Sequence, residues 1–194
     1  INLFQYITVR SAIAFFIALL LTIFIMPYYI LWAQSKQANQ PISKFAPKNH
    51  LQKANTPTMG GIIFVSMTLL ATLLCAKLTH IYVLLGIATL LLFALLGVSD
   101  DYSKISQNRN AGMSARKKFY LQIFLSFLLS LALYWTTLNT EFYLPFFKNA
   151  LFDWGLFGVL FWTLVFVATS NAVNLTDGLD GLVAIPSIYA LTSL

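Results

Sequence analysis

Apolar runs of about 20 residues recur along this chain, and they constrain its fold more than any other feature. Hydrophobic residues make up 59% of the 194 residues and charged residues only 9%, against about a quarter in soluble domains. A run of this length crosses the hydrocarbon core of a bilayer as an α-helix, because a helix satisfies every backbone polar group internally. The sequence therefore predicts an all-α polytopic membrane protein.

Five full transmembrane helices are predicted, and a sixth is expected to begin near Leu179. Pro27 and Gly97 lie inside predicted spans, where either residue can kink a helix. The first residue is Ile, and Leu194 stands inside an apolar segment. We therefore expect a single transmembrane domain over residues 1–194 that is a fragment of a longer chain. The predicted spans are Ala12–Trp32, Gly60–Thr79, Tyr82–Ser99, Phe119–Leu138 and Trp154–Ser170.

Basic residues are distributed unevenly between the two sets of loops. Nine of the twelve lie in the segments 33–59 and 100–118, which fall on one side of the predicted spans. Loops rich in Lys and Arg stay in the cytoplasm, so we expect a periplasmic N-terminus. The same span count puts the polar segment Asn171–Gly181 on the cytoplasmic face. The net charge of +6 follows from this asymmetry, and no nucleic-acid partner is expected.

A pair of acidic residues, Asp100 and Asp101, follows the third predicted span. Carboxylates at a helix carboxyl terminus oppose the macrodipole at a cost of roughly 0.3–1 kcal/mol each. A cation should therefore lie nearby. Lys104, one helical turn on, is one candidate. A divalent cation or a basic side chain of an active site is the alternative that we favour.

A second acidic cluster lies in an Asn- and Asp-rich segment before the predicted sixth span. Asn171, Asn174 and Asp177 are spaced by three residues, as are Asp177 and Asp180, so they share one face of a helical turn. Asp177 alone could cap the sixth helix. Because a cap leaves the other polar residues unexplained, we favour substrate binding.

Two further polar segments border predicted spans. Lys53 and Thr58 precede a glycine pair. This arrangement can bind a phosphate at a helix N-terminus, and it is equally typical of an ordinary helix start. The basic run Arg116–Lys118 predicts anchoring at the membrane interface, with contact to a lipid phosphate as the alternative.

Three motifs occur in order along the chain. They read Thr-Pro-Thr-Met-Gly-Gly at Thr56–Gly61, Gly-Val-Ser-Asp-Asp-Tyr at Gly97–Tyr102, and Asn-Ala-Val-Asn-Leu-Thr-Asp-Gly-Leu-Asp-Gly-Leu at Asn171–Leu182. Together they resemble the polyprenyl-phosphate N-acetylhexosamine-1-phosphate transferase superfamily, and within it the branch that transfers phospho-MurNAc-pentapeptide. The last motif is long and highly specific.

The resemblance implies a multi-pass protein of the bacterial inner membrane, with about ten transmembrane helices in the complete chain and an active site on the cytoplasmic face. It implies a Mg²⁺-dependent transfer of phospho-MurNAc-pentapeptide from UDP-MurNAc-pentapeptide to undecaprenyl phosphate, which forms lipid I and releases UMP. The lipid bilayer is then a partner as well, and a homodimer stays open as the oligomeric state.

The same resemblance assigns roles to individual residues of this chain. It implies that Asp100 and Asp101 are catalytic and also metal ligands. It implies that a further Mg²⁺ ligand lies beyond Leu194, so that residues 1–194 are inactive alone. The substrate-binding residues that it implies are Lys53, Thr58, Asn174, Asp177 and Asp180.

An ion-coupled transporter or channel is the principal alternative function, because intramembrane acids also bind ions. Two features disfavour it: the acids lie at the ends of spans rather than at mid-depth, and the spans show no inverted repeat. A non-catalytic membrane scaffold would leave both acidic clusters without a purpose.

Overall fold

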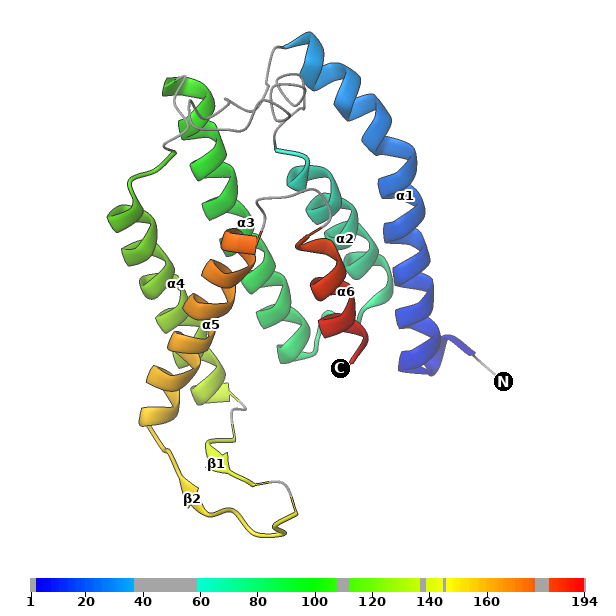
Figure 1. The fold of residues 1–194 in the computed structure, drawn as a ribbon. Helices are drawn as coiled ribbons and strands as arrows, with labels where there is room; N and C mark the ends of the chain where they lie inside the picture. Colours follow the sequence, from blue (N-terminus) through cyan, green and yellow to red (C-terminus); the bar gives the residue numbers. More distant parts are fainter. Residues whose placement is uncertain are drawn as a thin grey trace. The chain divides into compact units, whose positions relative to one another are not determined.

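The computed structural model describes residues 3–36, 59–107, 112–136, 139–144, 146–176 and 182–193, and the predicted helical fold is confirmed there. The chain divides into two compact units, Ile1–Lys118 and Phe119–Leu194. In order, its elements are a short 3₁₀ helix η1 (Leu3–Gln5), α1 (Ile7–Ser35), α2 (Gly61–Cys75), α3 (Ile81–Gln107), α4 (Ala115–Thr136), β1 (Glu141–Phe142), β2 (Phe152–Asp153), α5 (Phe157–Thr176) and α6 (Ala184–Thr192) (Figure 1).

The first unit is built from α1, α2 and α3, in which α1 contacts α2 and α2 contacts α3. Two of its most buried residues are small: Ala33 on α1 and Ala71 on α2. Small side chains let apolar helices approach closely inside a membrane. Pro27 lies within α1 without ending it.

The second unit buries polar side chains together with the apolar Leu129 and Val159. Its fully buried side chains include Gln122, Ser126 and Ser130 of α4, and Thr163 of α5 is also buried. Large apolar side chains lie on the outside instead. Helices that hide polar groups and expose apolar ones suit a hydrocarbon solvent.

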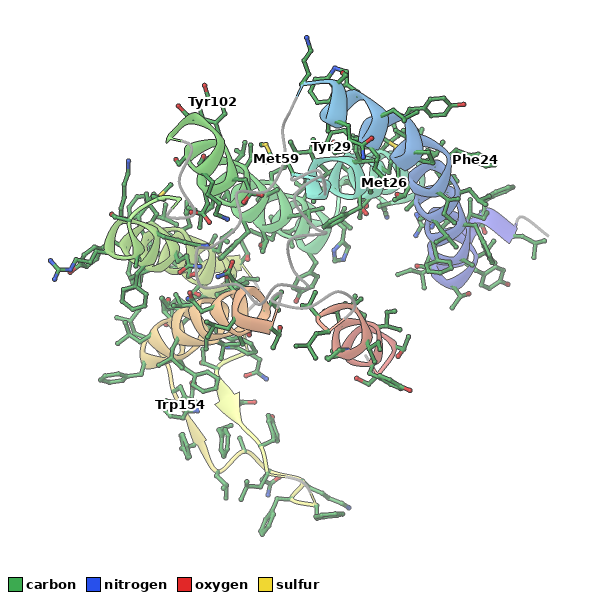
Figure 2. All side chains as sticks on the ribbon, turned by 45° about the horizontal axis from the view of Figure 1, so that its top comes forward. Phe24, Met26, Tyr29, Met59, Tyr102 and Trp154 are labelled. Carbon is green, nitrogen blue, oxygen red and sulfur yellow. The ribbon has the colours of Figure 1, made fainter. Side chains whose placement is uncertain are left out.

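Outward-facing apolar side chains are equally prominent on the first unit. Phe24 is 67% exposed, and Figure 2 shows it pointing away from α1. Among the described residues, α1, α3, α4 and α5 are long and apolar enough to cross a membrane. The helix α2 is apolar as well, but it has only 15 residues. The structure thus supports a membrane protein, and the predicted count of five full spans stays a prediction.

Several predicted boundaries are wrong. The helix α3 continues eight residues beyond Ser99 to Gln107, and α5 continues past Ser170 to Thr176. Polar residues continue both helices, and some of their side chains bond within the helix: Ser99 Oγ donates to the Leu95 carbonyl at 2.7 Å. In contrast, α2 ends at Cys75, because Ala76 turns to an extended backbone conformation.

A small β-hairpin connects α4 to α5, and the sequence analysis did not predict it. The antiparallel strands β1 and β2 pair Glu141 with Asp153 and Phe142 with Phe152. The rings of Phe142 and Phe152 stack with their centroids 5.1 Å apart, as cross-strand aromatic pairs do. Gly155 then turns the chain into α5 with a φ of +50°, a conformation that glycine adopts without strain.

Acidification should disorder this hairpin. The Tyr143 hydroxyl and the Asn139 amide hold the pKa of Glu141 below its ordinary value, and Thr140 and the Gly155 N–H do the same for the pKa of Asp153. A lowered folded-state pKa contributes stability above the unfolded pKa, and that stability is lost as the pH falls through the folded-state pKa. We therefore expect the hairpin to lose order below the ordinary carboxyl pKa of about 4.

The indole N–H resonance of Trp154 in an NMR spectrum can report this transition, because the ring centroids of Trp154 and Phe152 lie 5.2 Å apart. A variant that carries both Glu141→Gln and Asp153→Asn is the control and should show no acid step. A change of the wild-type Trp154 resonance at a pH above the ordinary carboxyl pKa would contradict the expected downward shift of the two pKa values.

Candidate functional site

The acidic pair of the sequence analysis forms the centre of a charged cluster in the first unit. Asp100 is buried at 7% exposure, and its Oδ2 lies 3.1 Å from Lys118 Nζ and 3.3 Å from Lys104 Nζ. Lys104 Nζ also donates to Asp101 Oδ1 at 2.8 Å. Each carboxylate thus has a cationic partner, which offsets the cost of charge beside an apolar span.

Local folding explains why Lys104 reaches both acids. Because α3 continues through the pair, Lys104 stands three residues after Asp101 and four after Asp100, and these are the spacings at which helical side chains meet. The interpretation with Lys104 as partner is therefore confirmed. The premise that the pair ends its helix is wrong, so the macrodipole argument does not apply.

The segment before α4 completes the cluster from the other side. The Met113 N–H donates to Asp100 Oδ1 at 2.9 Å. A Cβ on Gly112 would stand 2.5 Å from that same oxygen and 2.8 Å from the Asp100 carbonyl, so only glycine fits this approach. Ser114 immediately precedes α4, and its carbonyl accepts from the Lys118 N–H at 3.0 Å. This turn brings Lys118 to Asp100.

Two members of this cluster were missed by sequence reasoning. Lys118 was interpreted as an interfacial anchor, although its ammonium pairs with Asp100. Gly112 was not considered. Lys118 follows Asp100 by 18 residues and lies on a different helix, so no helical periodicity links them. The only usable signal was the need of two adjacent acids for more than one cation.

The other predicted site residues are placed only in part. Asn174 lies on α5, three residues after Asn171, and it is exposed. Asp100 and Asp101 belong to the first unit and Asn174 to the second, so their assembly into one site stays a prediction. Four predicted residues lie outside the described part of the chain: Lys53, Thr58, Asp177 and Asp180.

The described residues provide two adjacent carboxylates as oxygen donors for a divalent cation. Within the described ranges, no group of three or more His, Cys, Asp or Glu side chains gathers as a metal site. Mg²⁺ is commonly held by one or two carboxylates together with substrate phosphate oxygens. Asp100 and Asp101 are two carboxylates of that kind.

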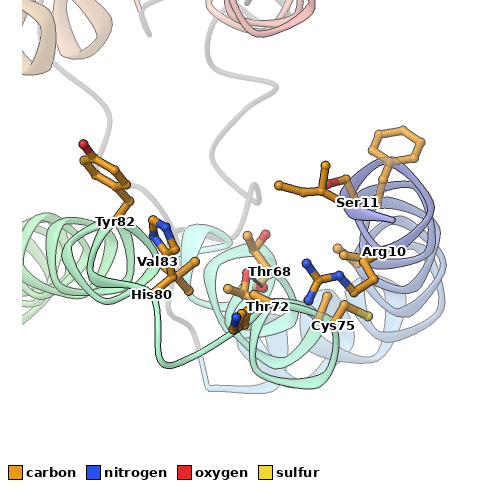
Figure 3. A pocket seen from close by; sticks show the side chains of 15 residues that line it. Arg10, Ser11, Thr68, Thr72, Cys75, His80, Tyr82 and Val83 are labelled. Atoms are coloured by element: carbon orange, nitrogen blue, oxygen red, sulfur yellow. Dashed lines mark hydrogen bonds between the residues drawn. The ribbon is translucent and has the colours of Figure 1, made fainter. Parts of the chain in front are cut away.

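Two of the cavities in the described part of the first unit have charged side chains in their lining. One of about 340 Å³ lies between α2 and α3, where Asp101 lines it together with apolar residues that include Phe64, Leu91 and Leu95. The other, of about 700 Å³, is lined by Arg10, Cys75 and His80 among others (Figure 3). The second cavity contains none of the predicted site residues. Only the first one joins an apolar wall to the acidic pair.

Apolar spans and a charged cluster at the end of one of them define an integral membrane protein with a polar site. Residues 80–194 match Glycosyl transferase family 4, which is more than half of the chain. The chain belongs to this family. Residues 53–65 also match signature 1 of phospho-N-acetylmuramoyl-pentapeptide-transferase.

Several curated relatives carry the same name as that signature. The chain is 57% identical to the phospho-N-acetylmuramoyl-pentapeptide-transferase of Nitratiruptor sp., 54% to that of Wolinella succinogenes and 56% to that of Helicobacter pylori. Each alignment covers 100% of this chain and 55% of the relative. The chain thus spans about half the length of the curated relatives that it matches.

Proposed function

We propose that the full-length protein is a phosphoglycosyl transferase that makes lipid I. It transfers phospho-MurNAc-pentapeptide from UDP-MurNAc-pentapeptide to undecaprenyl phosphate and releases UMP. The observation that carries this proposal is the identity of 54–57% to transferases of that name over nearly the entire chain. The match of residues 53–65 to their signature supports it independently of overall identity.

In the reaction, a phosphate oxygen of the lipid carrier attacks the β-phosphorus of the nucleotide sugar. The bond from that phosphorus to the bridging oxygen breaks, and UMP leaves. Catalysis of such transfers rests mainly on positioning and electrostatics. We propose one of two roles for Asp100. It is the base that accepts the proton of the attacking lipid phosphate, or it attacks the β-phosphorus first, displaces UMP and is itself displaced by the lipid phosphate in a second step.

The charged cluster supports a role for the acidic pair with phosphates. Two carboxylates alone would repel a phosphate, but Lys104 and Lys118 balance their charge. We propose that Asp100 and Asp101 hold Mg²⁺, which when bound neutralises charge on the diphosphate and the leaving UMP. Lys53, Thr58, Asn174, Asp177 and Asp180 are the proposed substrate-binding residues.

The lipid substrate is proposed to approach from the bilayer. The cavity between α2 and α3 joins an apolar lining to Asp101, which suits an amphiphile with a phosphate head. We place this site on the cytoplasmic face of the bacterial inner membrane, with α2 as a fifth membrane helix. A homodimer is compatible with the family and is part of the proposal.

Lipid I formation by the purified full-length protein tests the proposed function. The assay follows labelled UDP-MurNAc-pentapeptide into a product that partitions with undecaprenyl phosphate, with and without Mg²⁺. We expect product only with both substrates and the metal present. UMP-free turnover, or equal turnover with UDP-GlcNAc, would contradict the proposed substrate.

The proposed orientation can be tested in intact cells. Single cysteines are introduced at Ser43, Ser106 or Asn139 of the full-length protein after every native cysteine, Cys75 included, has been replaced. An impermeant thiol reagent should label only the Asn139 site, because Lys- and Arg-rich loops stay inside. Labelling at Ser43 or Ser106 would reverse the orientation and remove the argument for a shared cytoplasmic site.

A further inference from the structure

Gln122 of α4 is the largest of the fully buried side chains in the described part of the molecule, with 1% exposure. A carboxamide in an apolar setting costs free energy unless both of its polar atoms are hydrogen-bonded. The sequence analysis gave it no role. The hydrogen bonds of Gln122 therefore indicate what the buried amide does.

Both polar atoms of Gln122 bond to α5. Gln122 Nε2 donates to Ser170 Oγ at 3.0 Å, and Asn171 Nδ2 donates to Gln122 Oε1 at 2.9 Å. Consecutive residues of an α-helix point about 100° apart around the axis, because 3.6 residues make one turn. A side chain that bonds to two consecutive residues thus restrains both the rotation of α5 about its axis and its position along that axis.

The same bonds orient the amide of Asn171. Asn171 Nδ2 donates to Gln122 Oε1 and also to the Val167 carbonyl at 2.8 Å. Because both contacts use the amide nitrogen, the Oδ1 atom of Asn171 is turned away from them. Asn171 and Asn174 stand three residues apart in the last turns of α5, which is the spacing of one helix face.

Packing alone does not require these hydrogen bonds. Ser126 and Ser130 follow Gln122 at intervals of four residues on the same face of α4, and both are fully buried. Among the described residues, neither hydroxyl has a hydrogen-bond partner. This face of α4 is therefore buried at Ser126 and Ser130 without side-chain hydrogen bonds from their hydroxyls. The hydrogen-bonded side chain, Gln122, lies instead beside the carboxyl-terminal part of α5.

We propose that Gln122 is a positioning residue for nucleotide-sugar binding, acting through Ser170 and Asn171 to set the rotation of the α5 carboxyl terminus from which Asn174 projects. This inference rests on the proposed function. Supporting residues that lock a binding residue in its productive direction are what gives a site its precision. Gln122 itself does not touch the substrate.

The test uses Gln122→Met in the full-length protein, because Met keeps the volume of the side chain and removes both hydrogen bonds. We expect the KM for UDP-MurNAc-pentapeptide to rise roughly tenfold or more, in the range for residues that orient a ligand-binding group. The KM for undecaprenyl phosphate should stay within about twofold. The control is Ser130→Ala, which alters the same buried face of α4 two turns away and should change neither KM.

A double-mutant cycle separates positioning from general stability. If Gln122 acts through Asn171, the variant with both Gln122→Met and Asn171→Leu should bind nucleotide sugar no worse than Asn171→Leu alone. Additive losses, or an equal rise of both KM values with a lowered melting temperature, would overturn the inference and leave Gln122 as a helix–helix contact.

The test includes a second variant and a wild-type control. Should Gln122→Met fail to fold, Ser170→Ala removes only one hydrogen bond, and an unchanged KM for the nucleotide sugar would then overturn the inference. The wild-type rate is measured in the same assay. A wild-type protein that forms no lipid I would overturn the proposed function together with this inference, whereas normal wild-type turnover with an unaltered variant KM overturns the inference alone.

Discussion

Replacement of Asp100 or Asp101 by asparagine in the full-length protein is expected to reduce lipid I formation by roughly 10²–10⁴-fold, the range for a group that handles a proton in the transition state. Asparagine keeps the size of the side chain, and its oxygen can still accept from the Met113 N–H that Asp100 binds at 2.9 Å. What is lost is the negative charge that faces Lys104 and Lys118. The loss should appear mainly in kcat, and for Asp100→Asn the melting temperature should fall as well, because Lys118 then faces a neutral amide in place of a buried carboxylate.

The measurement is turnover of labelled UDP-MurNAc-pentapeptide, together with membrane insertion and a melting curve in detergent for each variant. Glu141→Gln is the matched control, because Glu141 is an acid of the hairpin in the second unit, where it accepts from the Tyr143 hydroxyl. Near-normal turnover in both Asp100→Asn and Asp101→Asn would leave the pair with a structural role only. A collapse of the melting temperature with intact turnover per folded molecule would lead to the same conclusion.

Removal of Lys118 should have the next largest effect. The Lys118 ammonium lies 3.1 Å from Asp100 Oδ2, and Asp100 is buried, so Lys118→Met leaves that carboxylate with Lys104 as its remaining ion-pair partner. Loss of a hydrogen-bond partner from a buried polar group costs about 1–3 kcal/mol. We expect stability to fall by that amount and turnover to fall by roughly 10–100-fold, because the catalytic carboxylate loses an orienting partner.

Lys117→Met provides the comparison for this variant. Lys117 is the neighbouring lysine, its side chain is exposed, and it carries the same charge in the same basic run. If Lys118 were only an anchor at the membrane interface, the two substitutions would weaken the protein equally. Equal turnover and equal melting temperatures in the two variants would therefore refute a specific role for Lys118 at Asp100.

The apolar runs determined the class of this protein without any tertiary information. A span of about 20 apolar residues has one low-energy state in a bilayer, the helix. All five predicted spans correspond to described helices, although α2 is shorter than predicted. The motifs were equally local, since short strings such as Asn171–Leu182 identify the family without their structure. The hairpin was missed because its two-residue strands are too short to carry an alternating pattern.

Only the tertiary structure shows which side chains form hydrogen bonds and ion pairs with each polar group. Lys104 could be foreseen beside the acidic pair, because its spacing is that of one helical turn. Lys118, 18 residues from Asp100, and Asn171, 49 residues from Gln122, could not, because each pair joins two different helices. Hydropathy measures how a residue partitions into lipid, and it carries no information on which buried polar atoms meet. Those meetings depend on the rotation of each helix and on the turn at Gly112, which only packing determines.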